Sequence, residues 1–224
     1  SFFIIYATKL EEPTTEKSDV MEGIKGALSY RHLVLGIIAI FFYVGIEVGI
    51  PGQLLFYLSE PGGVLGSAAI AGTIAGIYWL LMLVGRLTSA FISGAVSSRA
   101  QLIVVSAVAI ILLVVAIFMP ETSKITLQGA EVPTKVLFII LCGLCTSVMW
   151  GVIFNLATEG LGKYTASASG LFMTMVVGGG IMPFVQNIAA GSIGHIQSYW
   201  IVVAMLVYML FYALVGSRVS NKAK

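Results

Sequence analysis

Long apolar runs alternate with short polar stretches along the chain. Each run is long enough to cross a hydrocarbon core of about 30 Å, which takes about 20 helical residues. Strands of an outer-membrane barrel would be about 10 residues long and would alternate apolar with polar positions, and the sequence has no such alternation. The pattern predicts an all-α integral membrane protein with six transmembrane helices, at residues 33–58, 66–96, 101–119, 136–158, 165–190 and 197–217.

The composition agrees with a membrane protein and excludes several other classes. Of the 224 residues, 58% are hydrophobic and 10% are charged, whereas soluble domains average about 25% charged residues. This excludes a water-soluble fold and a disordered tail. The net charge of +2 is too small to attract a polyanion such as nucleic acid. The two cysteines cannot build a disulfide framework.

The basic residues predict the orientation of the spans. Lysine and arginine concentrate on the cytoplasmic side of membrane proteins. If the residues before the first span are cytoplasmic, that side holds ten of the twelve basic residues, and the opposite side holds Lys124 and Lys135. We therefore expect a multi-pass protein of the cell membrane, a bacterial inner membrane, with both ends of this segment in the cytoplasm.

The sequence also predicts how the chain is divided. Residues 1–8 (SFFIIYAT) are typical of the end of a preceding transmembrane helix, because eight apolar residues are too few to span and no basic region precedes them as in a signal peptide. The polar residues 9–32 are then a cytoplasmic linker between two halves. Residues 33–217 form a C-terminal six-helix transmembrane domain, and residues 218–224 form a cytoplasmic tail.

The character of the spans repeats after the third one. The first and fourth spans carry polar or helix-breaking residues in mid-membrane, the second and fifth are rich in small residues, and the third and sixth are almost wholly apolar. This order predicts two three-helix inverted repeats, with interrupted helices around a central site. We expect an interruption at Pro51–Gly52 in the first span, and we expect the third and sixth spans to face lipid.

Two segments resemble a known family. The first span contains FFYVGIEVGIPGQLLFYL (41–58), and the fourth span with its exit contains VMWGVIFNLATEGLGKYTASASGLFMTMVVGGGIMP (148–183). Both are similar to the second half of sugar transporters of the major facilitator superfamily, in the fucose–proton symporter family with its glucose/galactose porters. The resemblance covers the whole chain, as the last six of twelve helices. One loop motif of the superfamily is degraded here to Gly94-Ala-Val-Ser-Ser-Arg99, with hydroxyls in place of the acid.

The resemblance implies half of a secondary active transporter that moves a monosaccharide by alternating access. Transport would be cation-coupled symport, with a proton or sodium as the cation. The implied partners are the lipid bilayer, the sugar, the cation and a missing N-terminal six-helix half, and no cofactor is implied. The alternative is a six-span scaffold or half of a homodimeric channel. An enzyme is not expected, because the sequence lacks metalloprotease, serine-hydrolase and phosphate-loop motifs.

Glu47 is the first candidate site residue. It is the one acid within the six predicted spans and lies about 13 residues into the first, which is about 20 Å at 1.5 Å per residue. An intramembrane carboxylate is costly, so it should face the bundle interior or a water-filled cavity. It would bind sugar hydroxyls, act as the coupling acid, or be a structural carboxyl. Tyr43, one turn earlier on the same face, would orient it.

Two arginines are candidates for gating or structural roles. Arg86 lies near the cytoplasmic end of the second span, whereas Glu47 lies near the midplane. The sequence therefore predicts that the two are not partners, and that Arg86 reaches the membrane interface or caps a facing helix. Arg99 is the basic residue that remains of the degraded loop motif.

Amides, tryptophans and helix-bending residues complete the candidates. Amides donate and accept hydrogen bonds as sugar hydroxyls do, and tryptophan rings can stack on a pyranose; contacts between helices are the alternative for each. Glycines and a proline in the fifth span give pliable points or close packing. Cys142 and Cys145 are expected to be small apolar residues, not a metal site. The binding candidates are Gln53, Trp79, Trp150, Asn155, Gln186 and Asn187, and the gating candidates are Gly178, Gly179, Gly180 and Pro183.

Overall fold

The computed structural model describes residues 20–59, 65, 67–92 and 94–219. The predicted all-α architecture of six spans is confirmed, because six helical segments are long and apolar enough to cross a membrane. The predicted helix end at 1–8, much of the predicted linker and the last five residues lie outside the described residues. The six segments are Arg31–Ser59, Ala68–Phe91, Ser98–Phe118, Lys135–Thr158, Gly162–Ile193 and Tyr199–Gly216.

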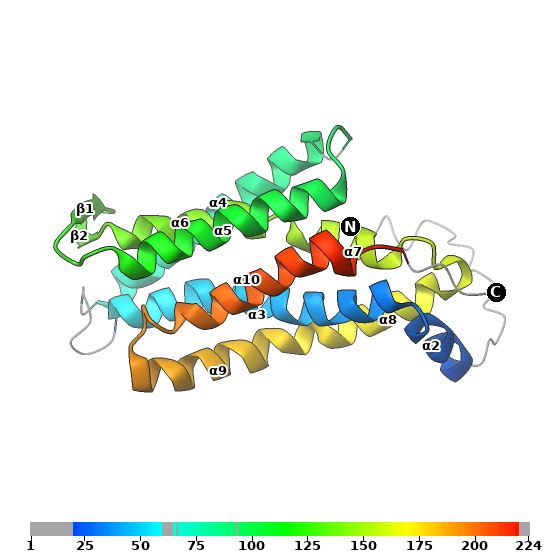
Figure 1. Ribbon diagram of the computed structural model, residues 1–224. Coiled ribbons are helices and arrows are strands. Elements are labelled where there is room, and N and C mark those ends of the chain that lie inside the picture. The colour runs from blue at the N-terminus through cyan, green and yellow to red at the C-terminus, as the bar shows by residue number, and fades with distance from the viewer. Residues whose placement is uncertain (1–19, 60–64, 66, 93, 220–224) are drawn as a thin grey trace, which may run out of the picture.

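The helices form one elongated bundle, with a β-hairpin at one end and helix α2 at the other (Figure 1). We call these the hairpin end and the α2 end. In chain order the elements are α2 (Val20–Leu28), α3 (Arg31–Ser59), α4 (Ala68–Ile92), α5 (Ser98–Phe118), β1 (Lys124–Leu127), β2 (Ala130–Pro133), α6 (Lys135–Thr146), α7 (Met149–Thr158), η1 (Gly162–Tyr164), α8 (Thr165–Thr174), η2 (Met175–Val177), α9 (Gly178–Ile193), α10 (Tyr199–Phe211) and the π-helical turn η3 (Tyr212–Gly216).

The central helix is α3, which contacts α4, α6, α7, α9 and α10. It runs without a break through Pro51, so the expected interruption at this position is wrong. An internal proline costs about 3 kcal/mol, because it removes a hydrogen bond and crowds the carbonyl one turn back. Packing against five neighbouring helices offsets this cost. The Tyr199 hydroxyl also donates a 2.8 Å hydrogen bond to the Ile50 carbonyl, beside the proline.

The fourth and fifth spans are the interrupted ones. In the fourth, α6 ends at Thr146 and α7 begins at Met149, with a turn at residues 147 and 148. The Ser147 hydroxyl donates a 2.6 Å hydrogen bond to the Leu144 carbonyl. This carbonyl therefore has a hydrogen-bond partner without a backbone N–H of a continuing helix. In the fifth span, the 3-10 turn η2 separates α8 from α9.

The β-hairpin is an addition that the hydropathy pattern did not predict. Strands β1 and β2 pair antiparallel, with Leu127 opposite Ala130 and Lys124 opposite Pro133. The two turn residues, Gln128 and Gly129, have φ values of 51° and 80°. Two positive φ values suit the tight turn whose twist matches that of the strands, and glycine adopts this backbone without strain.

Glycines allow α9 to lie directly against α3. A Cβ on Gly178 would collide with the Phe41 carbonyl, and a Cβ on Gly45 would collide with the side chain of Met182. Small residues at such crossings let two backbones approach and gain van der Waals contact, the main attraction between helices in lipid. Helices α5 and α10 also contact each other; their placement toward lipid stays a prediction.

Candidate functional site

An ion pair joins the first two spans. Arg86 Nη2 on α4 lies 2.8 Å from Glu47 Oε1 on α3, within hydrogen-bond distance. The Glu47 side chain is 15% exposed and that of Arg86 is 52% exposed in this chain. The prediction that the two residues are not partners is therefore wrong.

The direction of side chains along antiparallel helices explains this pairing. Helix α3 runs from the α2 end to the hairpin end, and α4 runs back beside it (Figure 1). Side chains of a helix lean toward its N-terminus. Arg86 therefore leans toward the hairpin end and Glu47 toward the α2 end, so the two side chains converge. The depths of the two residues in the sequence analysis rest on backbone positions counted along each span. That count includes neither the lean of a side chain nor the length of the arginine side chain.

Aromatic and small residues surround the ion pair. A hollow of about 420 Å³ is lined by Arg86, Ser147, Trp150 and Gly151. The half-buried Trp150 ring packs edge-on against Tyr43, with ring centroids 6.1 Å apart. Tyr43 is buried, and its hydroxyl has no hydrogen-bond partner among the described residues. The structure thus brings together four predicted site residues: Tyr43, Glu47, Arg86 and Trp150.

The buried amides lie elsewhere, toward the hairpin end. Gln53 is hydrogen-bonded to His195 Nδ1, in the turn after α9. Gln186 on α9 contacts the Ser198 hydroxyl at 3.4 Å, and that hydroxyl donates to the His195 carbonyl at 2.6 Å. Both amides are almost fully buried. They connect helices in this structure, which is the alternative that the sequence left open for them.

The remaining polar and aromatic candidates are exposed. Asn155 on α7 lines two further hollows near the α2 end. Trp79 on α4 and Asn187 on α9 are exposed and are not among the residues that line the hollow at Arg86. Tyr78 packs edge-on against Trp79 and is hydrogen-bonded to the Thr146 hydroxyl at 2.8 Å.

The candidates for gating occupy two places. Arg99, at the start of α5, donates a 3.5 Å hydrogen bond from Nη2 to the Ser217 carbonyl, so it ties α5 to the end of the sixth span. The glycine run opens α9 directly after the η2 turn. Gly178 packs on the α3 backbone, whereas Gly180 faces open space. Pro183 lies inside α9.

A second charged cluster, missed by the sequence analysis, closes the hairpin end. The Lys135 ammonium lies 3.1 Å from Glu121 Oε1, and its side chain is only 5% exposed. The Tyr57 hydroxyl donates to the same carboxylate oxygen at 3.0 Å. Partial burial by itself would raise the pKa of Glu121, but the hydrogen bonds from Lys135 and Tyr57 and the charge of Lys135 outweigh it and lower that pKa.

We expect this cluster to make the hairpin end sensitive to acid. A carboxyl with a lowered pKa in the folded state stabilises the protein above its unfolded pKa, and this contribution is lost as the pH falls through the folded pKa. As the pH falls through this lowered pKa, which lies below the ordinary value of a glutamate, Glu121 is protonated and the buried Lys135 loses its partner. The amide protection of the hairpin in the purified protein, measured by hydrogen exchange relative to the intrinsic exchange rate at each pH, should therefore fall on acidification. In Glu121→Gln this protection should already be low at neutral pH and should change little with acid.

Glu131→Gln is the matched control, because Glu131 pairs with the exposed Lys124 at 3.7 Å on the same hairpin. This variant should keep the acid response of the parent protein, since exposed ion pairs contribute little. An acid response in Glu121→Gln equal to that of the parent would contradict the assignment.

Comparison with known proteins places the fold. No protein-family model matches the chain. The chain is 33% identical over 217 residues to the glucose/galactose transporter of Brucella abortus, covering 97% of this chain and 50% of that protein. It is 24% identical over 185 residues to the L-fucose-proton symporter of Escherichia coli, covering 81% of this chain and 39% of the symporter. The chain spans about half the length of the curated relatives that it matches most extensively.

A solved structure agrees with these relatives. The crystal structure of the major facilitator superfamily transporter FucP, in the outward conformation, matches with a TM-score of 0.76 at 21% identity. The match covers 94% of this chain and 50% of FucP. The chain is therefore a homologue of the glucose/galactose transporter and of the L-fucose-proton symporter, and it has the fold of the C-terminal six-helix half of a major facilitator superfamily transporter.

Proposed function

We propose that the chain forms half of a secondary active transporter that moves a monosaccharide across the membrane, and that the sugar binds at the Glu47–Arg86 pair. The observation that carries the proposal is the position of this pair. Glu47 lies midway along α3, and its partner Arg86 lines a hollow beside Trp150. The names of the relatives, glucose/galactose transporter and L-fucose-proton symporter, support a sugar as the substrate.

The chemistry of the hollow suits a polyol. A carboxylate accepts hydrogen bonds from hydroxyls, and a guanidinium donates to them, and charge-assisted bonds of this kind are about twice as strong as neutral ones. Trp150 offers an aromatic face or edge to the C–H groups of a pyranose. The Tyr43 ring packs edge-on against the Trp150 ring. In this proposal Glu47, Arg86 and Trp150 contact the sugar, and Tyr43 positions them.

The α2 end is the cytoplasmic end in this proposal. Among the described residues, five basic residues lie at that end and two at the hairpin end, which follows the usual bias of membrane proteins. The five are Lys25, Arg31, Arg99, Lys163 and Arg218, and the two are Lys124 and Lys135. Alternating access then requires the six helices to rock against a second half, and the site is completed by that half. Gly178 and the η2 turn, at the crossing of α9 with α3, give a point about which α8 and α9 can change angle.

Uptake by the full-length protein tests the proposal. Cells that lack their own hexose carriers should take up labelled glucose or galactose with saturation kinetics when they express it. Trp150→Phe should keep the fold and raise the KM about 10-fold or more, corresponding to about 1.4 kcal/mol of lost binding.

Trp200→Phe is the matched control, because Trp200 lies on α10 and packs on Phe118, away from the hollow. Its KM should equal that of the parent protein. Absence of saturable uptake of any hexose or deoxyhexose by a correctly inserted protein would refute the proposed substrate.

A further inference from the structure

Polar and small residues form a stripe along α7 that continues beyond the hollow at Arg86. Ser147, Gly151, Asn155 and Glu159 follow one another at intervals of four residues, which places them on one face of a helix. Ser147 lies in the turn before α7, and Glu159 caps its last residue. The stripe begins beside Arg86 and ends at the α2 end of the bundle.

Three hollows follow one another along this stripe. The first, of about 420 Å³, includes Arg86 and Gly151. The second, of about 130 Å³, includes Gly151 and Asn155. The third, of about 500 Å³, includes Asn155 and Glu159. Neighbouring hollows share a lining residue, so they adjoin one another from Arg86, which contacts Glu47, to the α2 end. We call this series of hollows the α7 groove.

The interruption of the fourth span accounts for the groove. Helix α4 lies directly against α6 at Gly85, where a Cβ would collide with the Ser147 hydroxyl. The chain then turns at residues 147 and 148, and α7 packs on α5 and α3 instead. The space between α4 and α7 is lined by hydroxyls and an amide, those of Ser89, Ser98 and Gln101.

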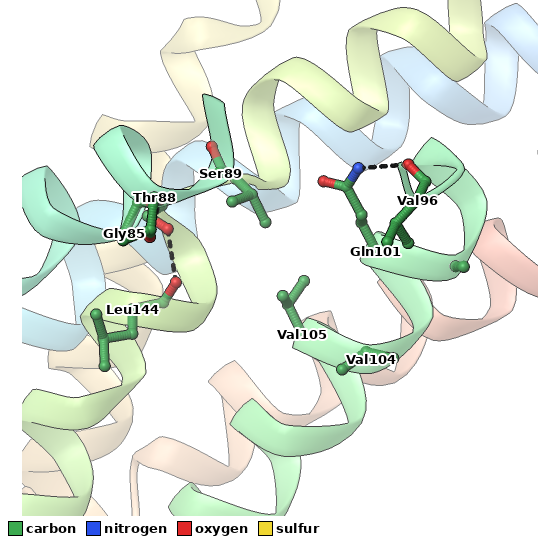
Figure 2. A pocket seen from close by; sticks show the side chains of 11 residues that line it. Gly85, Thr88, Ser89, Val96, Gln101, Val104, Val105 and Leu144 are labelled. Carbon is green, nitrogen blue, oxygen red and sulfur yellow. Dashed lines mark hydrogen bonds between the residues drawn. The ribbon is translucent and has the colours of Figure 1, made fainter. Parts of the chain in front are cut away.

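Figure 2 shows a neighbouring hollow between α4, α5 and the end of α6, which shares Ser89 and Gln101 with the second hollow. Ser89 and Gln101 lie across the hollow from each other, and the Gln101 amide donates to the Val96 carbonyl at 2.7 Å. Toward Val104 and Val105 the hollow becomes apolar. The polar part therefore continues along α7 toward Asn155, and the apolar part faces away from it.

We infer that the α7 groove is a hydrated path by which water and the coupling proton reach Glu47 from the α2 end. This inference rests on the proposed transport function. The narrowest hollow, about 130 Å³, is below the range of about 300–1,000 Å³ for small-molecule sites. It is ample for water, which occupies about 30 Å³ and needs two to four polar partners. The groove thus suits water and hydronium, not a pyranose.

The proton transfer conserves atoms and charge. Hydronium in the groove gives its proton to the Glu47 carboxylate, an O–H bond forms, neutral water remains, and the ion pair with Arg86 opens. The reverse transfer restores the pair. The charged and titratable groups near Glu47 are Arg86 and Tyr78 of α4 and Tyr43 of α3 itself. Arg99 and Glu159 lie at the outer mouth of the groove.

Thiol labelling of the full-length protein tests access without any sugar. Cys142 and Cys145 are first replaced by Ala, and Gly151→Cys then supplies a thiol in the groove. A small cationic methanethiosulfonate reagent, added to inside-out vesicles, should label it. Adding Asn155→Leu should slow the labelling at least 10-fold, because an apolar side chain dewets the narrow part. Asn187→Leu, an exposed amide on α9, should leave the rate unchanged. Absence of labelling, or equal rates with Asn155→Leu, would overturn the inference.

A second experiment tests the proton path. Asn155→Leu replaces the amide that lines the second and third hollows and leaves the residues that line the hollow at Arg86 unchanged. Uphill sugar accumulation should fall at least 10-fold, while sugar exchange stays within about twofold of the parent protein. Asn187→Leu, at an exposed amide on α9, should preserve both activities. Unchanged accumulation, or an equal loss of exchange, would overturn the inference. If the parent protein carries no sugar, the proposed function fails and the labelling experiment alone decides on the groove.

Discussion

Glu47→Gln is expected to abolish uphill sugar accumulation by the full-length transporter and to leave sugar exchange intact. Gln keeps the shape of the side chain and can still bond to Arg86, which lies 2.8 Å from Glu47 Oε1, but it cannot gain or lose a proton. A carrier without the coupling acid only equilibrates the sugar, so the accumulation ratio should fall to about 1. Steady-state uptake and counterflow of labelled sugar in vesicles measure the two activities separately.

Glu131→Gln is the control for this experiment. It is the same substitution on the exposed β2 strand, where Glu131 pairs with Lys124, and it should preserve both accumulation and exchange. If accumulation and exchange fall together in Glu47→Gln, Glu47 binds sugar without coupling protons. If both persist unchanged, Glu47 is a structural carboxyl, and both the binding site and the proton path proposed here are wrong.

Gly178→Leu is expected to destabilise the fold strongly. A Cβ at this position would collide with the backbone carbonyl of Phe41, and a backbone atom cannot rotate away as a side chain can. Helix α9 would have to move off α3, and the contact around Gly45 and Met182 would open with it. Overpacking of a core costs about 1–3 kcal/mol even where side chains can adjust, so we expect a loss above about 3 kcal/mol. For a domain of this size that lowers the Tm by about 6–12 °C or more.

Gly180→Leu is the matched control within the same glycine run. A Cβ on Gly180 meets no atom within 4 Å, so the larger side chain is accommodated. The amount of folded protein in membranes and its Tm in detergent should match those of the parent protein. Equal stability of the two variants would mean that α9 does not lie against α3 as described.

The general architecture was predictable because it depends on local sequence. A hydrocarbon core requires about 20 consecutive apolar residues per span, and this requirement alone marks all six helices. The interruptions within the spans were harder to predict from the sequence. The break at residues 147 and 148 and the η2 turn contain no proline, whereas Pro51 lies in an unbroken helix. In each case packing against neighbouring helices, not the residue type, decided the backbone.

The candidate site was predictable only in part. The cost of a carboxylate in a membrane singles out Glu47 without any structure. The four-residue spacing of Ser147, Gly151, Asn155 and Glu159 was also present in the sequence, but its meaning depends on α7 packing against α3 and α5 while hollows line its other face. The buried amides show the opposite case, because Gln53 and Gln186 look like sugar ligands in the sequence and connect helices in the structure.

The sequence by itself therefore determined the number of spans, their bounds within a few residues, the resemblance to a transporter half and the one intramembrane acid. Tertiary structure decided which groups meet. Glu47 and Arg86 are 39 residues apart and lie at different depths when counted along their own helices. They meet because α3 and α4 run antiparallel, so that Glu47 leans toward the α2 end and Arg86 leans toward the hairpin end. Hydropathy depends on each residue's own transfer free energy, whereas pairing depends on the relative position and direction of two helices, and only the folded bundle contains that information.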